Sequence, residues 1–565
     1  MIESLNHNGV LFQEPFESKG FNEIDGVKIS LLAEEMLWKF APYMNNKKYN
    51  ENEVFLNNVW IDLKPQLPLE LQERKFPNDF MTTICKMTIA SIALKSKKSE
   101  YNKSNKKEID DKKSEIKEKY GYCYKNGLKT EISNPYVESS RWFISRGELC
   151  GRWVSRVMPE DIEINASEYV PCIENHHWKK IELRQTDYIA TYKINIGFGK
   201  VFIDKFVWLS ANSIDKQNDN EYKYEKARKL SLKINDIEKK VLDDVISESR
   251  FKRDNALITY LVLTFGIRIG NDLGENNFRD KNVRGASTLC KENIILKKDN
   301  KLHLKFIGKD SVPYSETMKI DSRVYDILSK LIENKESTDK VFEYADSQSV
   351  NTYLKSIYKG EITVKNFRTA KAGLTLSNEI QKRNWKNLTD KEFKNNLMEC
   401  CLQTSLLLNH HKTVSDEQKE KISMSSDKRL DNARNTMNKT IENVNKKLNQ
   451  LKSDKEDFEL YLVGHLLESK LEEIKEKENE LNEKIKSAKK KYDDVEKEII
   501  FKKNSIDVNL NTAISNYSTP KLSISLCKYA DKKPSLIYSK SQLKKFEWAM
   551  DVKDDYWKKY PDTEK

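Results

Sequence analysis

The sequence lacks the features of a membrane-spanning or secreted protein. Its longest apolar run, residues 256–267, is shorter than the roughly 20 residues that a membrane-spanning helix needs. The first ten residues, MIESLNHNGV, have no apolar signal core. The eight cysteines form no CxxC pair, and we interpret the adjacent Cys400 and Cys401 as packing residues of a helix. These absences predict a soluble, intracellular protein with reduced thiols and no membrane contact.

Motifs for nucleotide and metal chemistry are also missing. The sequence contains neither GxxxxGKS nor GxxxxGKT, which would cradle the phosphates of ATP or GTP. It has no acidic cluster suited to Mg²⁺. We therefore expect no metal ion, no nucleotide and no other cofactor.

Charge of both signs is abundant, with a modest excess of positive charge. The 100 Lys and Arg residues exceed the 88 Asp and Glu residues by 12, on a chain that is 33% charged. This excess permits a polyanionic partner but does not require one. A Lys-rich soluble protein without such a partner would have the same composition.

The first two segments of the chain differ in composition. Residues 1–215 contain strand-like pieces, TDYIATYKINI and KVFIDKFVWL, and the alternation in the second predicts a half-buried strand. Between residues 95 and 121 a Lys- and Glu-rich stretch indicates one or two exposed helices. Residues 216–412 are expected to be mostly helical, interrupted by one hairpin, LHLKF to VPYSETMKI, with Lys309 at its tip.

Residues 413–506 change sharply to Lys, Glu, Asn and Asp with sparse aliphatic residues. The residues with heptad spacing are Met437, Ile441, Val444, Leu448 and Leu451 in a first arm, and Leu467, Leu471, Ile474, Glu478, Leu481, Ile485, Ala488, Tyr492, Val495 and Ile499 in a second. Two arms separated by a short interval suggest an antiparallel hairpin, although a dimerising coiled coil has the same pattern. Residues 507–565 indicate short helices that are too small to fold alone and should dock on the helices of 216–412.

Five short segments carry side chains that could surround one phosphodiester. The segments GIRIGND, FIGKDS, VKNFRT, LLNHHK and SNYSTPK contain, in this order, Arg268, Lys309, Arg368, His410 and Tyr517. Arginines and an imidazole can stabilise the charge of a phosphorane, a lysine can serve the leaving oxygen, and a tyrosine can attack phosphorus. Each residue alone is explained more simply by ordinary packing or ion pairing, because the chain has 25 tyrosines and many cations.

In their order along the chain, these segments resemble the eukaryotic-type DNA topoisomerase IB family, within the tyrosine recombinase/topoisomerase IB superfamily. Further segments of the same resemblance are HNGVLF, KEKYGYC, RVMPEDIEIN, HHWKKIE, YEKARKL and IYSKSQLKKFEWAMD, so it extends over nearly the whole chain. Such ordered agreement is more specific than any isolated motif. The resemblance implies that Arg268, Lys309, Arg368, His410 and Tyr517 are the catalytic residues.

The resemblance also implies the reaction. Arg268, Arg368 and His410 would contact the non-bridging oxygens of a DNA phosphate. Tyr517 would attack the phosphorus and form a 3′-phosphotyrosyl link, while Lys309 would protonate the departing 5′-oxygen. Rotation of the free strand before religation would relax supercoiled DNA without ATP or metal.

Weaker DNA contacts are implied at Arg146, Lys205, Lys223, Asp310, Lys365 and Asn516. For most of these residues a surface salt bridge or a capping role is an equal alternative. The segment around Arg146 departs from the family pattern, because Ile144 and Ser145 precede it and ELCGRW follows. We expect this departure to affect fine DNA preference more than the reaction.

The fold implied by the resemblance is α+β, arranged as a bilobed DNA clamp. Residues 1–215 would form a mixed α/β cap, 216–412 a mainly helical catalytic core with a small hairpin sheet, 413–506 an antiparallel coiled-coil linker, and 507–565 a C-terminal domain with the nucleophile. The implied partner is double-stranded DNA, bound by a monomer. The expected location is on DNA, in the nucleus or, for a viral protein, in the virion or viral factory.

Two other functions remain open from the sequence. A tyrosine recombinase shares the chemistry, but there a histidine typically precedes the second arginine as HxxR, whereas this chain has Lys365 in that place. The long heptad segment between His410 and Tyr517 also favours the topoisomerase. A non-catalytic DNA or scaffold protein is the second alternative, and the occupation of all five positions argues against it.

Overall fold

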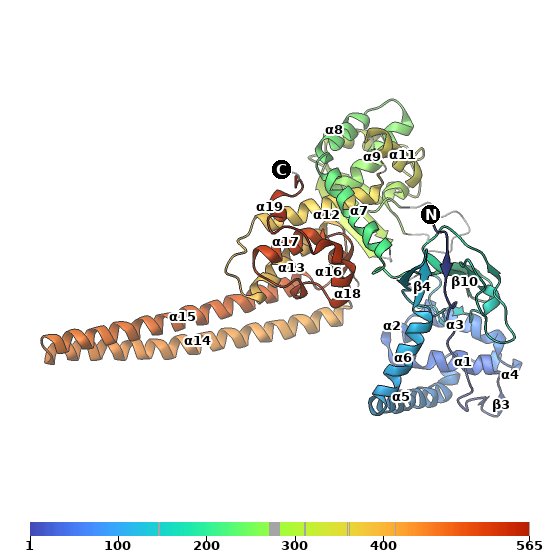
Figure 1. The fold of residues 1–565 in the computed structure, drawn as a ribbon, viewed down its shortest axis with the longest axis horizontal. Coiled ribbons are helices and arrows are strands. Elements are labelled where there is room, and N and C mark those ends of the chain that lie inside the picture. The colour runs from blue at the N-terminus through green and yellow to red at the C-terminus, as the bar shows by residue number, and fades with distance from the viewer. Residues whose placement is uncertain are drawn as a thin grey trace.

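A computed structural model describes residues 1–144, 147–270, 283–309, 312–358, 360, 362–412 and 414–563. The protein has an α+β fold, in which many helices surround several small sheets (Figure 1). None of the helices in the described ranges is both long enough and apolar enough to span a membrane.

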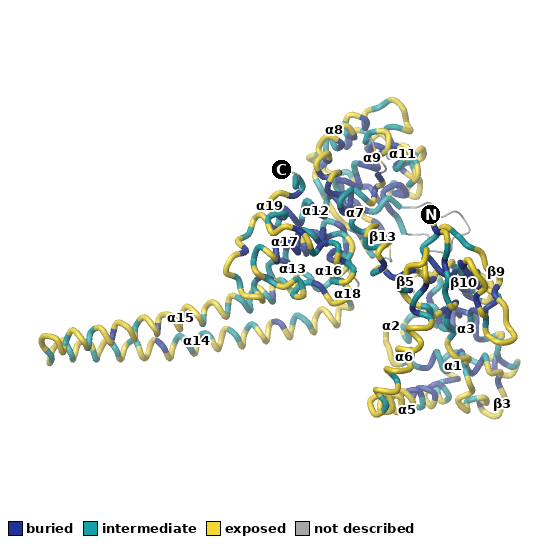
Figure 2. The backbone as a smooth tube through the Cα atoms, viewed as in Figure 1, coloured by how far each residue is buried: buried dark blue, intermediate teal, exposed yellow. Residues whose placement is uncertain are grey.

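The N-terminal part, up to about residue 209, contains a group of helices and three sheets, the smallest of which is the pair β2 (Glu23–Ile24) and β3 (Val27–Lys28). Its helices are α1 (Leu31–Phe40), α2 (Lys47–Asn50), α3 (Glu53–Leu63), α4 (Leu69–Gln72), α5 (Met81–Ser104) and α6 (Lys106–Tyr120). Most residues between 95 and 120 are exposed, which confirms the prediction of exposed helices in the charged stretch (Figure 2). An apolar cluster that includes Met36, Phe40, Phe55 and Trp153 holds α1, α3 and α5 together.

The largest sheet of this part contains two long strands. A three-stranded sheet has the order β1 (Leu5–Asn6), β4 (Tyr122–Lys125) and β5 (Leu128–Glu131), and the larger sheet contains β6 (Arg141–Trp142), β7 (Trp153–Val154), β8 (Glu163–Ile164), β9 (Lys180–Ile181), β10 (Tyr188–Ile196) and β11 (Val201–Trp208). Strands β10 and β11 pair antiparallel with Ile194 opposite Ile203. Phe202 and Trp208 on β11 are exposed while Val201 and Val207 are buried, so β11 is the half-buried strand that the alternation predicts.

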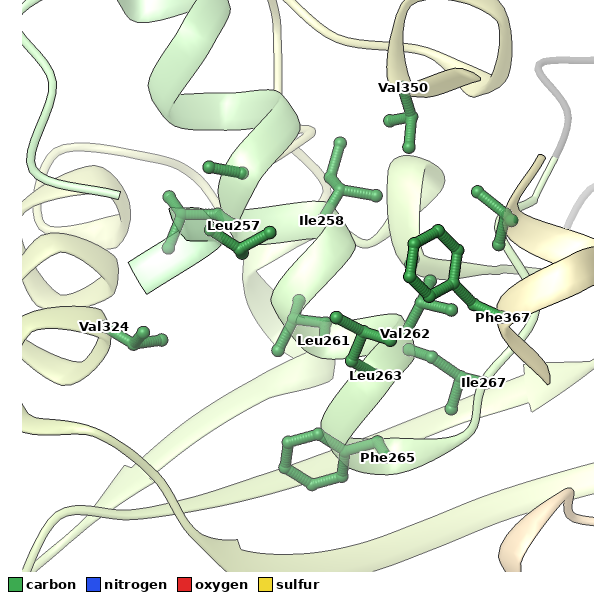
Figure 3. Close-up of a cluster of buried hydrophobic side chains, with 14 of the residues drawn as sticks. Leu257, Ile258, Leu261, Val262, Leu263, Phe265, Ile267, Val324, Val350 and Phe367 are labelled. Carbon is green, nitrogen blue, oxygen red and sulfur yellow. The ribbon is translucent and has the colours of Figure 1, made fainter. Parts of the chain in front are cut away.

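The central part contains most of the remaining helices and one sheet. The helices are α7 (Ile214–Ser231), α8 (Ile234–Asp244), α9 (Arg250–Phe265), α10 (Ser322–Ile332), α11 (Ser347–Ile357), α12 (Val364–Gln381) and α13 (Asp390–Leu407). Helix α9 is buried on nearly all sides, because Leu257, Leu261, Val262 and Phe265 pack into the largest apolar cluster (Figure 3). Cys400 and Cys401 are buried on α13 with free thiols, consistent with packing residues.

The predicted hairpin is present but belongs to a three-stranded antiparallel sheet. Strands β13 (Lys301–Gly308) and β14 (Val312–Lys319) form the hairpin, and Lys309 follows β13 directly. The sequence analysis missed β12 (Ile294–Lys297), which pairs with β13. The turn between these strands contains Asp299 and Asn300 at φ values of 63° and 52°. Consecutive Asp and Asn residues that tolerate positive φ are a hairpin signal, so β12 could have been predicted.

Two long helices extend away from the rest of the molecule (Figure 1). They are α14 (Asp416–Tyr461) and α15 (His465–Asn504), which lie side by side in opposite directions and are joined by a short turn at Gly464. Every residue with heptad spacing is buried or half-buried, whereas most residues between them are exposed. The ion pairs Arg429–Glu498, at 2.6 Å, and Lys503–Asp427, at 2.7 Å, join the two helices. Helix α14 alone is about 70 Å long at 1.5 Å per residue.

The last four helices dock on the central part, as predicted for the segment from residue 507. They are α16 (Leu510–Asn516), α17 (Pro520–Tyr529), α18 (Lys540–Lys545) and α19 (Tyr556–Lys559). Their buried side chains, such as Leu522 and Ile524, share one apolar cluster with Leu376 of α12 and Leu397 of α13. The chain therefore returns from α15 to the same body of helices that it left after α13.

Gly266 ends helix α9 in a conformation that other residues rarely adopt. Its φ is 63°, and a Cβ atom there would lie 2.0 Å from the carbonyl oxygen of Leu407 at the end of α13. Glycine therefore allows the ends of α9 and α13 to meet.

We expect Gly266→Ala to lower the melting temperature more than Gly26→Ala. Both positions have positive φ, so alanine would cost about 1–2 kcal/mol at each. Only at Gly266 would the new methyl group also clash with backbone, since no atom lies within 4 Å of a Cβ at Gly26. Thermal unfolding followed by circular dichroism should show an additional decrease of at least about 3 °C for Gly266→Ala. Equal decreases would contradict the close approach of α9 and α13.

Candidate active site

The five residues that the sequence analysis singled out as catalytic come from five different places in the chain. Arg268 follows α9, Lys309 follows β13, Arg368 lies on α12, His410 follows α13, and Tyr517 follows α16. Close approach of these elements brings the residues into one region.

A cavity of about 130 Å³ unites three of them. Arg268, Lys309 and His410 all line it, together with Arg284 and His411. Arg268 is held by its backbone, because its carbonyl oxygen accepts a 2.8 Å hydrogen bond from the N–H of Ala286. The cavity wall therefore carries positive charge from several separate elements.

Arg368 and Tyr517 are close to His410 but are not among the residues that line the cavity. The guanidinium carbon of Arg368 is 5.4 Å from the centre of the Tyr517 ring, and the His410 ring centre is 5.0 Å from it. Arg368 donates a 2.9 Å hydrogen bond from Nη2 to the carbonyl oxygen of Leu408. The structure thus places both Arg368 and His410 beside the Tyr517 ring.

The segment around His410 is held by backbone bonds to the segment that follows α15. The N–H of His410 donates to the carbonyl oxygen of Ser405 at 2.9 Å, and the N–H of Asn509 donates to the carbonyl oxygen of His410 at 2.6 Å. Lys412 donates in the same way to Asp507 at 2.6 Å. The two ends of the long helical hairpin are therefore joined next to His410, close to the start of the helix that leads to Tyr517.

Several nitrogen atoms of the cluster are buried without a hydrogen-bond partner. They are Nε of Arg368 and both ring nitrogens of His410, none of which bonds to another described residue. Arg368 and His410 are only 6% and 4% exposed, so these atoms cannot be satisfied by bulk water. Buried donors left unpaired are costly, which indicates that a ligand with acceptor oxygens completes the cluster.

Burial also controls the charge of the two residues. Burial, with the positive charges of Arg368, Arg268 and His411, lowers the pKa of His410 to about 3. His410 is therefore neutral near pH 7 and has one ring N–H to donate. Burial lowers the pKa of Arg368 to about 10, which still leaves the guanidinium charged at neutral pH.

Two of the other predicted residues lie beside Tyr517. Lys223 on α7 donates from Nζ to the carbonyl oxygen of Asn516 at 2.5 Å, and its Nζ is 5.9 Å from the centre of the Tyr517 ring. Asn516 is exposed, and its side-chain oxygen accepts a 3.4 Å hydrogen bond from Lys545. Burial, with the nearby charges of Lys365 and Lys545, lowers the pKa of Lys223 to about 7.

The remaining predicted residues are more distant from the cluster or not described. Lys365 is exposed one turn before Arg368 on α12. Lys205 on β11 forms a 2.6 Å ion pair with Glu138, so in this structure it has the salt-bridge role considered above. Arg146 and Asp310 lie outside the described residues.

Arg284 was missed by the sequence analysis. It lines the cavity with Arg268 and Lys309, because its N–H donates a 2.7 Å hydrogen bond to the carbonyl oxygen of Ile307 on β13. Val283 also forms a parallel bridge to Ile307. No local motif marks Arg284, since its position depends on this contact with a distant strand.

The cluster does not resemble a metal centre. Within the part of the chain that the structure describes, no three His, Cys, Asp or Glu side chains are grouped so that they could hold a metal ion. The fold and the cluster together define an α+β protein with a buried, cationic site that contains a tyrosine.

Comparisons with known proteins identify the family. Three family models match along the chain: "Eukaryotic DNA topoisomerase I, DNA binding fragment" at residues 2–208, "Eukaryotic DNA topoisomerase I, catalytic core" at 212–454, and "C-terminal topoisomerase domain" at 489–559. The chain therefore belongs to the eukaryotic DNA topoisomerase I family, which confirms the resemblance in its sequence.

Similar curated proteins cover nearly the whole chain. DNA topoisomerase 1 beta of Arabidopsis thaliana is 28% identical over 574 residues, which are 98% of this chain and 59% of that protein. DNA topoisomerase 1 of Candidozyma auris is 28% identical over 643 residues, covering 98% and 83%. DNA topoisomerase 1 of Homo sapiens is 25% identical over 569 residues, covering 98% and 71%. The chain thus spans 59% of the length of the Arabidopsis thaliana relative.

The lowered pKa of His410 predicts a specific loss of stability in acid. The folded-state pKa, about 3, is below the value of about 6.5 for an unfolded histidine, so protons favour the unfolded state. Stability should fall as the pH drops below about 6.5, by up to about 1.4 kcal/mol per pH unit. His410→Gln should remove this part of the loss.

Melting temperatures between pH 7.5 and 4.5 provide the measurement, with His465→Gln as the control because His465 lies exposed at the tip of the helical hairpin. A His410→Gln variant that loses stability as steeply as the unaltered protein would contradict the buried, neutral state of His410.

Proposed function

We propose that this protein is a type IB DNA topoisomerase, which relaxes supercoiled double-stranded DNA by cutting and resealing one strand. The observation that carries this proposal is the cluster of Arg368, His410 and Tyr517, where buried nitrogen atoms without partners lie next to a tyrosine ring. A phosphodiester suits such a cluster, because its non-bridging oxygens are negatively charged and accept hydrogen bonds. Membership of the topoisomerase I family supports the same assignment.

The proposed reaction has two matched steps. The Tyr517 oxygen attacks the scissile phosphorus and its proton passes to water, while the bond from phosphorus to the deoxyribose 5′-oxygen breaks. Lys309 gives a proton to the departing oxygen, so the products are a 3′-phosphotyrosyl link and a free 5′-hydroxyl. The reverse attack by that hydroxyl restores the original bond and both protonation states. One phosphodiester replaces another, so the cycle needs no energy from ATP.

Charge stabilisation in this reaction would come from the protein itself. Arg268 and Arg368 would hold the non-bridging oxygens, and the neutral His410 would donate one further hydrogen bond. Removing one such donor from an enzyme typically slows the reaction by about 100-fold or more. We infer that these groups supply the positive charge that a metal ion supplies in other phosphoryl transferases, so that neither metal nor nucleotide is required.

The proposal extends to the domain organisation. Residues 1–215 would be a DNA-binding cap, 216–412 the catalytic core, 413–506 an antiparallel coiled-coil linker, and 507–565 a C-terminal domain that contributes Tyr517. Separate apolar clusters in the N-terminal and central parts support two lobes, which would close around a duplex as a monomeric clamp. The buried and half-buried residues with heptad spacing, where α14 and α15 meet, support the linker assignment.

DNA contacts outside the cluster are part of the proposal. Lys223, Lys365 and Asn516 lie close enough to Tyr517 or Arg368 to reach phosphates that flank the cut. Lys205 would exchange its ion pair with Glu138 for a phosphate. Contacts by the two predicted residues outside the described ranges are proposed on the resemblance alone. The protein would act on DNA in a nucleus or, for a viral protein, in a virion or viral factory.

Plasmid relaxation tests the proposed function directly. The protein should relax supercoiled plasmid in EDTA without ATP, and Tyr517→Phe should abolish relaxation because the nucleophilic oxygen is lost. Tyr529→Phe is the matched control, since Tyr529 contacts Trp557 and is distant from the cluster along α17. Relaxation by the Tyr517→Phe variant, or none by the unaltered protein, would refute the proposal.

Arg284 should contribute to the same reaction, because it lines the cavity with Arg268 and Lys309. We expect Arg284→Ala to slow single-turnover cleavage by about 100-fold, the effect of losing one charged donor. Arg250→Ala is the control, since Arg250 lies exposed at the opposite end of α9 beside Tyr344. Rates that are equal in the two variants would exclude Arg284 from the site.

A further inference from the structure

The segment from α19 to Pro561 is inserted between helices that carry residues of the candidate site. Tyr560 is only 4% exposed, and its side chain reaches α7, α12 and the start of α17. Helix α19 lies against α12 and α17 in the structure (Figure 1). The segment from α19 to Pro561 is therefore part of the buried core.

We propose that Tyr560 is a positioning residue, which sets the Tyr517 segment against the helix that carries Arg368. The inference rests on the proposed function for its catalytic consequence, but its structural basis is independent of it. Tyr560 would not touch DNA. It would act through Gly373 and through Thr519, whose side-chain oxygen approaches the same point on α12 as the Tyr560 hydroxyl.

The position of Tyr560 explains a glycine inside a helix. A Cβ atom on Gly373, in the middle of α12, would lie 2.3 Å from the Tyr560 hydroxyl oxygen and 3.0 Å from Oγ1 of Thr519. Glycine is a poor helix former, so its presence there fits a need for space. Both oxygens approach the same point on α12.

Gly373 and Thr519 are close in sequence to residues of the cluster. Gly373 lies five residues after Arg368 on the same helix, and Thr519 lies two residues after Tyr517. Thr519 is also the N-cap residue directly before α17. A shift of the Tyr560 side chain would therefore move the backbone next to Tyr517 relative to Arg368.

Several hydrogen bonds hold the segment in place. Arg228, which is 2% exposed on α7 and pairs with Glu225, donates from Nη1 to the carbonyl oxygen of Pro561 at 2.7 Å. The N–H of Trp557 donates to Oγ of Ser525 on α17 at 3.2 Å. These bonds attach both sides of Tyr560 to the central helices.

A double-mutant cycle, made of Gly373→Ala, Tyr560→Leu and the variant with both changes, tests the inference. Single-turnover formation of the covalent complex on a suicide duplex is measured, with DNA affinity from gel shifts. Gly373→Ala should slow cleavage about tenfold or more when Tyr560 is present, because displaced reacting groups lose rate steeply. In the Tyr560→Leu background the same change should have less than about a twofold effect, since the shorter side chain no longer meets the methyl group. DNA affinity should stay unchanged throughout.

Equal effects of Gly373→Ala in both backgrounds, or a parallel loss of DNA affinity, would overturn the inference. Tyr560→Phe adds a second comparison, because it keeps the ring and removes only the oxygen. It should lower the cleavage rate while leaving the melting temperature nearly unchanged. A melting temperature that falls in proportion to the rate would indicate a purely structural role.

Amide hydrogen exchange separates this inference from the proposed function. The amides of residues 516–520 should exchange faster in Tyr560→Leu than in the unaltered protein, whether or not the protein cleaves DNA. An unaltered protein that forms no covalent complex would refute the proposed function alone. Unchanged exchange in this segment would refute the positioning role.

Discussion

The burial of the Arg368 guanidinium beside Tyr517 and His410 is the constraint on which the site depends. Its described polar contact is the carbonyl oxygen of Leu408, and its Nε atom has no partner among the described residues. A buried charge that has no carboxylate partner among the described residues is costly, and burial also keeps His410 neutral. An anionic ligand would remove both penalties at once, because it supplies charge to Arg368 and acceptors to the unpaired nitrogens. In the proposed function, the site would thus be organised for an anion before one binds.

The site also accommodates a long insertion between two of its residues. The hairpin α14–α15 separates His410 from Tyr517 in sequence, yet backbone hydrogen bonds of residues 410–412 to residues 507–509 join its two ends. The base of the hairpin thus forms part of the support for the cluster. None of the described residues of α14 and α15 lines the cavity itself.

Those parts of the fold could be predicted in which a local sequence pattern reflects which side chains are buried. Alternation with period 2 located the half-buried β11, and heptad spacing located the buried seam of the two long helices, because one face of each element meets the protein interior. Strand β12 was missed, although Asp299 and Asn300 mark its turn, because its four residues are too few to show a clear period. Docking of the last helices was also foreseen, since they cannot bury their apolar faces alone.

By itself, the sequence determined the family, the α+β class and the identity of the cationic and tyrosine side chains, because these follow from residue order and local periodicity. Only the tertiary structure decided which of them meet: it joined Arg368, His410 and Tyr517, added Arg284 through a bridge to β13, and inserted Tyr560 beside Gly373. It also decided the neutral state of His410. Burial, hydrogen bonding and pKa depend on neighbours that are distant along the chain, and no local pattern records those neighbours.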